Sequence, residues 1–209
     1  VEMPQSWRLT RLEDCDSVTT FPCVVRKPRG SGGAGMLLAD SPEGLRAAAG
    51  SLKYWPLQVT EFIGSGAATH VAVRLHIIGR SLADFWAIPA GHWNIHAHDA
   101  DWSLAAACDT RFRDWLTHFD ARSLIDGVCR IFGPGWYALD TVWTWDRLWC
   151  CEIGLKAADP VRAKLFRDHG VRWTVPKCAD TPGLIESLIA IEITGRPPWE
   201  LAERLERER

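Results

Sequence analysis

A lysine followed by a glycine-rich run is the segment of this sequence best suited to chemistry. Residues 21–35 read FPCVVRKPRGSGGAG, so Lys27 ends a short β-rich run and a glycine-rich turn follows it, made by Gly30, Ser31, Gly32 and Gly33. Glycines accept positive φ and let the backbone approach a ligand, and the N–H groups of such a turn form an anion-binding concavity. The run predicts a phosphate-gripping strand–turn–strand, with a tight turn beside a solvated lysine as the alternative.

This glycine-rich run matches neither of two common nucleotide motifs. Gly-Lys-Ser/Thr is absent, which excludes a Walker loop, and no G-x-G-x-x-G opens a helix here, which excludes a Rossmann fingerprint.

A second candidate is a pair of acids, Asp140 and Glu152, in two expected strands at 137–144 and 148–155. Facing residues of an antiparallel pair share one face of the sheet. A three-residue loop at 145–147 pairs 140 with 152, at the cost of positive φ at Arg147 or of a bulge that absorbs the extra residue. Two carboxylates on one face suit Mg²⁺, whereas two unrelated surface acids are the alternative interpretation.

The elements that must position these residues alternate between short strands and helices. Ser41 followed by Pro42 predicts a helix start, and Gly64–Gly66 predicts a hinge after a strand. The pattern predicts further strands at 21–25, 36–39, 57–63, 70–78 and 81–88, and helices at 103–119, 120–132, from 181 and after 198. Residues 1–20 show no strong periodicity, and the whole indicates an α+β fold.

Composition narrows the function classes. The 209 residues are 47% hydrophobic with a net charge of −2, which indicates a globular chain without an electrostatic footprint for nucleic acid. The sequence contains no run of 18 apolar residues, so no membrane span is expected. Seven cysteines without C-x-x-C favour a reducing, cytoplasmic setting, and Cys150 and Cys151 are expected to be packed thiols. Most of the 12 tryptophans are expected in the core, with an aromatic ligand wall as the alternative.

The order of these features resembles the ATP-grasp superfamily of carboxylate–amine ligases, and most closely its ribosomal-S6-glutamate-ligase-like branch. Val25-Arg-Lys27-Pro before the glycine-rich loop looks like the family's Val-x-Lys-Pro. Thr60-Glu61-Phe62-Ile63 looks like the adenine hinge, and Val73-Arg74 like the following strand. Ala-Leu-Asp140 and Glu152-Ile-Gly close the pattern.

The resemblance implies an α+β ATP-grasp-like fold of two subdomains, expected at 1–64 and 65–209, that clamp a nucleotide between antiparallel sheets. It implies ATP and Mg²⁺ as cofactors, and γ-phosphoryl transfer to a carboxylate followed by attack of an amine on the acyl-phosphate. The implied nucleotide contacts are Lys27, Gly30, Ser31, Gly32, Gly33, Glu61, Phe62, Ile63 and His70. The implied metal ligands are Asp140 and Glu152, and the implied reaction-site residues are Arg74 and Asn94.

Departures from the family pattern leave a second function open. Gly154 stands where the family usually has an asparagine at its last metal site, and Gly91-His92-Trp93-Asn94 keeps an asparagine but not the arginine. The family's N-terminal domain and upstream phosphate lysine are expected from a preceding segment or a partner chain. The alternative to a ligase is a degenerate ATP-grasp module that binds a nucleotide or a partner protein without catalysis. The sequence does not identify the carboxylate or the amine.

A histidine-rich segment offers a rival metal site. His92, His96 and His98 with Asp99 and Asp101 have the residue types of a zinc site. No fourth ligand of suitable spacing is evident, so a polar loop is favoured. A Ser/His/Asp hydrolase is not supported, because the sequence has no G-x-S-x-G elbow.

Overall fold

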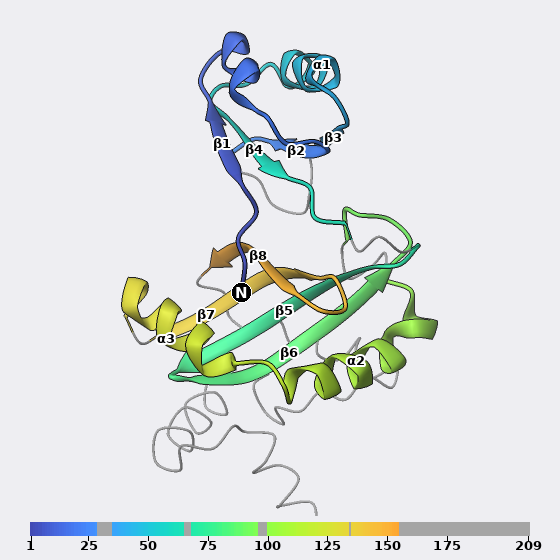
Figure 1. Cartoon of the computed structure of the whole chain (residues 1–209), viewed down its shortest axis with the longest axis vertical. Coiled ribbons are helices and arrows are strands. Elements are labelled where there is room, and N and C mark those ends of the chain that lie inside the picture. Colours follow the sequence, from blue (N-terminus) through green and yellow to red (C-terminus); the bar gives the residue numbers. More distant parts are fainter. Residues whose placement is uncertain (29–34, 65–67, 96–99, 134, 155–209) are drawn as a thin grey trace, which may run out of the picture.

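The computed structural model describes residues 1–28, 35–64, 68–95, 100–133 and 135–154. These residues form two four-stranded antiparallel sheets, each with helices on one face (Figure 1). The helices expected from 181 and after 198 lie outside the described residues. The mixed helix and antiparallel-sheet architecture confirms the α+β fold that the sequence predicts.

The small sheet has the order β1-β4-β2-β3, from β1 (Ser6–Leu9), β2 (Cys23–Arg26), β3 (Leu37–Ala39) and β4 (Leu57–Glu61). α1 (Pro42–Leu52) and a 3₁₀ helix, η1 (Leu12–Ser17), cover one face, and α1 lies on the side away from the large sheet (Figure 1). Alternate strand residues such as Val25, Val59 and Leu9 are fully buried in a core with Leu45 of α1. The other face of the small sheet therefore faces the large sheet.

The large sheet has the order β6-β5-β7-β8, from β5 (His70–Gly79), β6 (Ser81–Ala90), β7 (Gly135–Trp143) and β8 (Leu148–Gly154). α2 (Trp102–Leu116) and α3 (Ala121–Phe132) supply Phe112 and Val128 to its main core. Val73, Leu75 and Leu139 are buried in this core. Residues between them in sequence, such as Arg74, consequently lie on the opposite face, which is turned toward the small sheet and is called the cleft face below (Figure 1).

Helix capping follows the sequence signals. Ser41 accepts a hydrogen bond from the Gly44 N–H at 3.1 Å at the start of α1. Asp101 caps α2 by accepting from the Ser103 N–H, and Asp120 caps α3 by accepting from the Ser123 N–H. Asp101 is thus engaged as a helix cap, and His96, His98 and Asp99 of the rival zinc site lie outside the described residues.

The expected strand–turn–strand around the glycine-rich run is confirmed, because β2 and β3 pair antiparallel with Val25 opposite Leu37. β4 pairs with the other edge of β2, so the hinge strand, the glycine hairpin and α1 form one unit. The sequence analysis missed β1 and η1. β1 has four residues and forms only by pairing with β4, which is a tertiary contact.

The expected three-residue loop between β7 and β8 is wrong. Trp143 pairs with Leu148, and the Thr144 N–H donates to the Arg147 carbonyl at 3.0 Å, so the connection has an even length. Positive φ falls at Trp145 (71°) and not at Arg147. The ladder shifts between Asp140 and Thr141, so a β-bulge at Cys151 absorbs the extra residue, as the alternative anticipated.

The N-terminal segment connects the two sheets. The Glu2 N–H donates to the Leu148 carbonyl at 3.1 Å, and the Cys150 N–H donates to the Glu2 carbonyl at 2.9 Å. Glu2 therefore adds a parallel bridge to the outer edge of β8 before the chain enters β1 (Figure 1). This contact pairs backbone groups of an edge strand that would otherwise be exposed. No helix within the described ranges is long and apolar enough to cross a membrane.

Removal of the α1 cap should destabilise the small sheet. Ser41→Ala leaves the Gly44 N–H without its side-chain acceptor, so we expect a loss of about 1 kcal/mol in unfolding free energy, measured by thermal or denaturant unfolding. Ser51→Ala is the matched control, because it removes a hydroxyl that donates to the Ala48 carbonyl at the other end of the same helix without touching the cap. An equal loss in both variants would contradict a capping role.

Candidate functional site

A row of side chains crosses the cleft face of the large sheet, one from each strand. Trp86 of β6 pairs with Arg74 of β5, Arg74 pairs with Asp140 of β7, and Asp140 pairs with Glu152 of β8. Direct cross-strand partners share a face and have Cβ atoms about 5 Å apart. The structure thus brings together three residues that the sequence analysis singled out, Arg74, Asp140 and Glu152, and we call Trp86, Arg74, Asp140 and Glu152 the transverse row.

The centre of the transverse row is a bidentate ion pair. Arg74 donates from Nε to Asp140 Oδ1 at 2.5 Å and from Nη2 to Oδ2 at 2.8 Å. The Arg74 side chain is 18% exposed and that of Asp140 is 35% exposed, so the pair is only partly screened by solvent. Two parallel guanidinium–carboxylate hydrogen bonds of this kind pair the opposite charges and also fix the orientation of both side chains.

The small sheet supplies a second arginine to the row. Arg26 Nη1, at the end of β2, lies 3.6 Å from Glu152 Oε2, and the two side chains are 27% and 45% exposed. Two carboxylates therefore stand side by side with one guanidinium on each flank, Arg74 from the large sheet and Arg26 from the small one. The sequence analysis missed Arg26. Strand alternation was the available signal, because Val25 is buried beside α1 and its neighbour must face the other way.

Lys27 lies elsewhere. It follows the last residue of β2, its side chain is exposed, and its Nζ sits 5.4 Å from the ring centroid of Tyr54. Tyr54 follows α1, the helix on the face of the small sheet that is turned away from the large sheet. The glycines and Ser31 that follow Lys27 in sequence, Gly30 to Gly33, lie outside the described residues.

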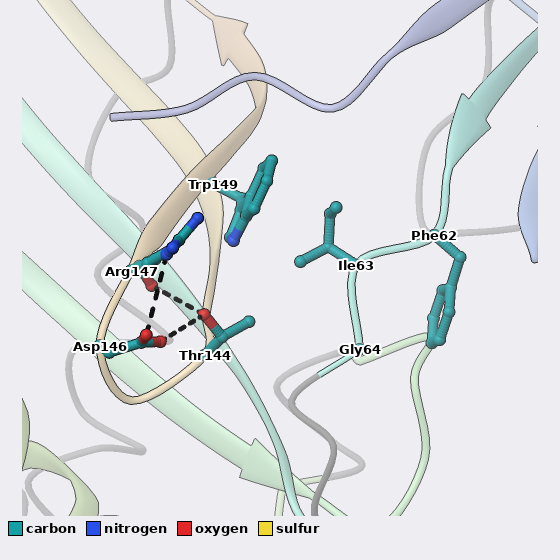
Figure 2. A pocket seen from close by; sticks show the side chains of 7 residues that line it. All are labelled: Phe62, Ile63, Gly64, Thr144, Asp146, Arg147 and Trp149. Carbon is teal, nitrogen blue, oxygen red and sulfur yellow. Dashed lines mark hydrogen bonds and ion pairs between the residues drawn. The ribbon is translucent and has the colours of Figure 1, made fainter. Parts of the chain in front are cut away.

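The hinge segment lines a pocket of about 340 Å³ together with the β7–β8 connection. Phe62, Ile63 and Gly64 form one wall, and the opposite wall consists of Thr144, Asp146, Arg147 and Trp149. Figure 2 shows Ile63 and Trp149 turned toward one another across this space, while Thr144, Asp146 and Arg147 bond among themselves at the hairpin end. Trp149 pairs with Val142, two residues along β7 from Asp140, so the pocket lies on the same face as the transverse row.

The remaining predicted residues gather at the hinge end of β5. The Phe62 ring makes edge contacts with His70 and Trp93, each with centroids 6.1 Å apart. His70 is partly buried, and this burial, aided by the nearby His92, lowers its pKa. Asn94 follows Trp93 in the turn after β6 and is partly exposed. Four residues of strand, about 13 Å, separate His70 from Arg74, so these residues form a group apart from the ion pairs.

The side chain and the backbone of Glu61 are both hydrogen-bonded within the protein. It ends β4, its carboxylate accepts from the Gln5 N–H at 3.1 Å, and its own N–H donates to the Gln5 carbonyl at 2.8 Å. The backbone of Phe62 also donates to the Pro22 carbonyl at 3.0 Å. These contacts hold the start of the hinge against β1 and the segment before β2.

A buried histidine lies next to the ion pair on the same face. His76 is two residues beyond Arg74 on β5, is 4% exposed, and packs against the Trp86 ring with centroids 5.1 Å apart. Neither ring nitrogen has a hydrogen-bond partner within the described part of the chain. Burial, reinforced by the positive charge of Arg74 and opposed by Asp140, lowers the pKa of His76 to about 4. The imidazole is therefore neutral at pH 7.

Asp140 and Glu152 fit a magnesium ion held jointly with a ligand. They are cross-strand partners, both partly exposed on the cleft face, and they present only oxygen donors. No group of three or more His, Cys, Asp or Glu comes together elsewhere among the residues that the structure describes. Mg²⁺ is usually bound through one or two carboxylates plus phosphate oxygens and waters, so two carboxylates are a sufficient protein contribution.

Solved ATP-grasp ligases share this architecture. The ATP-grasp ligase PsnB complexed with minimal precursor superposes with a TM-score of 0.55 at 15% identity, over 91% of this chain and 56% of that chain. PsnB complexed with precursor peptide PsnA2 and AMPPNP gives 0.52 at 16% identity, over 91% and 52%. The D-alanine–D-alanine ligase from Bacillus anthracis complexed with ATP gives 0.50 at 14% identity, over 91% and 60%.

These likenesses establish the fold. The chain has the ATP-grasp fold, which confirms the architecture that the resemblance implied, and it spans between 52% and 60% of the lengths of these three proteins. No protein-family model matches the sequence, and no curated protein matches it either.

Because His76 is buried, we expect the unfolding free energy to depend on pH in the acidic range. Its folded-state pKa of about 4 lies below the unfolded value of 6.5, so the unfolded state binds the proton first. Stability is then fully present above pH 6.5 and falls as the pH drops toward 4, by up to roughly 3 kcal/mol for this group. Denaturant unfolding between pH 7 and 4 should show a shallower loss in His76→Phe than in the wild type.

His118→Gln is the matched control for this measurement, because it removes an exposed imidazole. It should keep the acid dependence of the wild type. A His76→Phe variant whose stability falls as steeply as that of the wild type would contradict a buried, neutral imidazole.

Proposed function

We propose that the chain binds ATP with Mg²⁺ between its two sheets and is the nucleotide-binding part of a carboxylate–amine ligase. The observation that carries this proposal is the cross-strand pair Asp140–Glu152 on the cleft face, opposite the strand that precedes the glycine-rich run. Like charges side by side destabilise a sheet unless cations compensate them. Two arginines do so in this structure, and a metal–phosphate group is the ligand that such a carboxylate pair suits.

The hinge pocket supports an adenine site. Ile63 and Trp149 provide apolar and aromatic walls, and the hinge residues Phe62, Ile63 and Gly64 border the space. A cavity of about 340 Å³ is at the small end of the range for ligand pockets. In this proposal, the base lies against the hinge and the phosphates run along the cleft face toward the transverse row, with His70 near the ribose.

The reaction proposed for the transverse row is acyl-phosphate formation. A carboxylate oxygen of the substrate attacks the γ-phosphorus as the bond to the ADP oxygen breaks, and an amine then attacks the acyl carbon as phosphate leaves. Asp140 and Glu152 would hold Mg²⁺, which neutralises phosphate charge when bound. Arg74 would orient the transferred phosphoryl group, and Asn94 and Gly30–Gly33 are assigned to the substrate and phosphates on the sequence resemblance.

One observation favours a second candidate function, nucleotide binding without catalysis. Gly154 pairs with Ala138, so the next cross-strand position beyond Asp140 and Glu152 carries no side-chain oxygen. A single well-held metal is therefore expected rather than two. The PsnB and D-alanine–D-alanine ligase chains are also longer than this one, so a complete ligase would include segments that this chain does not span.

Nucleotide binding should depend on the two acids. Isothermal titration with ATP is expected to give millimolar or tighter binding with Mg²⁺ and much weaker binding with EDTA. Asp140→Asn and Glu152→Gln should each weaken Mg–ATP binding about tenfold, as expected for loss of a charged ligand. Asp126→Asn, which removes an exposed carboxylate on α3, is the control and should bind as the wild type does. No binding by the wild type would refute the proposal.

Hydroxylamine distinguishes the ligase from the binding module. It attacks an acyl-phosphate in place of the natural amine and leaves a hydroxamate. Incubation with Mg–ATP, hydroxylamine and a pool of amino acids and acidic peptides should yield hydroxamate and equimolar ADP if the chain is catalytic. Tight Mg–ATP binding without hydroxamate would favour the non-catalytic function.

A further inference from the structure

We infer that His76 is a positioning residue for Arg74, and that its imidazole accepts a hydrogen bond from the guanidinium when Asp140 holds Mg²⁺. The inference rests on the proposed function and deepens it by giving the buried histidine beside the transverse row a role in the loaded site. Three observations carry it: the ring nitrogens of His76, the place of its ring beside Trp86, and the two hydrogen bonds between Arg74 and Asp140.

The two ring nitrogens of His76 are buried without a hydrogen-bond partner among the described residues. Ala138, the residue beside it on β7, has no polar side-chain atom to offer. A buried polar group without a partner costs free energy, and nearly all such groups in folded proteins are therefore hydrogen-bonded. The unbonded imidazole thus indicates a second arrangement of the neighbouring side chains, in which one of its nitrogens is bonded.

The His76 ring lies beside Arg74. The two residues are two positions apart on β5, so they share the cleft face at a separation of about 7 Å along the strand. The ring leans toward the transverse row, because it packs against Trp86, which is the direct cross-strand partner of Arg74. Burial is the main cause of the lowered pKa of His76, and the positive charge of Arg74 adds to it. We therefore expect a change of rotamer in Arg74, without movement of the strand, to bring its guanidinium to the ring.

The contact between Arg74 and Asp140 involves the carboxylate that would hold the metal. Arg74 donates from Nε and Nη2 to both carboxylate oxygens of Asp140. A guanidinium and a divalent cation on one carboxylate repel each other, so a bound Mg²⁺ favours an Arg74 that is turned away from it. Because the Arg74 side chain is only 18% exposed, donors that leave Asp140 need another acceptor within the protein or on the ligand.

A neutral imidazole is suited to be that acceptor. One of its nitrogens carries a proton and the other accepts, so it can take a hydrogen bond from a guanidinium without neutralising the positive charge. A carboxylate at the same position would hold Arg74 by charge and would compete with the phosphate oxygens. His76 can therefore fix the direction of the Arg74 guanidinium and leave its charge to the phosphoryl group, whereas a phenyl ring would pack against Trp86 without offering an acceptor.

Equilibrium binding of Mg–ATP and of adenosine tests the assignment. His76→Phe keeps an aromatic ring and removes the acceptor, so it should weaken Mg–ATP binding at least fivefold. It should change adenosine binding less than twofold, because the hinge pocket does not include this residue. His76→Gln supplies a side-chain acceptor and should recover part of the affinity. His118→Gln, which removes an exposed imidazole, is the matched control and should bind as the wild type does.

Two further measurements separate positioning from packing. In an Arg74→Gln background, His76→Phe should change Mg–ATP binding less than twofold, because His76 acts through the guanidinium. The imidazole ¹⁵N signals of His76, assigned by their absence in His76→Gln, should shift when Mg–ATP is added and stay in place when adenosine is added.

The outcomes separate this inference from the proposed function. Mg–ATP binding by the wild type with unchanged affinity in His76→Phe would overturn the inference and leave the proposed function standing. An equal loss with and without Arg74, or an equal loss of ATP and adenosine affinity, would also overturn it, because both indicate a structural role. If Arg74→Gln binds too weakly to titrate, His76 signals that Mg–ATP does not move would overturn it instead. Failure of the wild type to bind Mg–ATP would overturn both. Circular dichroism of each variant checks that the fold is retained.

Discussion

One extra residue in β8 determines the chemistry of the cleft face. Upstream of the bulge, Thr141 pairs with Cys150, and continuing that register would place Glu152 opposite Leu139, which is fully buried against the helices. The bulge at Cys151 shifts the ladder by one, so that Glu152 meets Asp140 on the cleft face instead. A one-residue shift exchanges the faces of a strand, and here it converts a carboxylate that would be buried into one that faces the small sheet.

The carboxylate pair that results requires compensation, and the sheets provide it from two directions. Arg74 reaches Asp140 along the large sheet through two short hydrogen bonds, a contact fixed by the strand register. Arg26 reaches Glu152 from the small sheet through a longer and more exposed contact. The first pair is part of the rigid sheet, whereas the second joins two separately built sheets. The two arginines therefore differ in how readily they exchange partners.

The sequence predicted the elements well wherever alternation or capping signals were local. The glycine hairpin, the helix capped at Ser41 and the acidic hairpin were all predicted from such signals, and each is present. Prediction from the sequence failed where a tertiary contact decides whether a strand forms, as for β1, which forms by pairing with β4. The prediction of a three-residue loop was wrong for a simple reason. Pairing Asp140 with Glu152 requires one extra residue in the hairpin, and that residue can lie either in the loop or in a bulge of the strand.

The same limit explains why Lys27 stood out in the sequence and Arg26 did not. A motif that ends in lysine identifies the strand but does not fix which of two adjacent residues faces the cleft, and that choice depends on which face α1 covers.

Backbone contacts hold the two sheets at the Glu2–β8 bridge, and the hinge at Phe62–Gly64 joins them through the chain. Between these attachments lies the charged contact of Arg26 with Glu152, which side chains alone maintain. In the proposed function, a ligand that carries its own negative charge would enter between the sheets by displacing this one weak ion pair, and the backbone attachments of both sheets would stay in place.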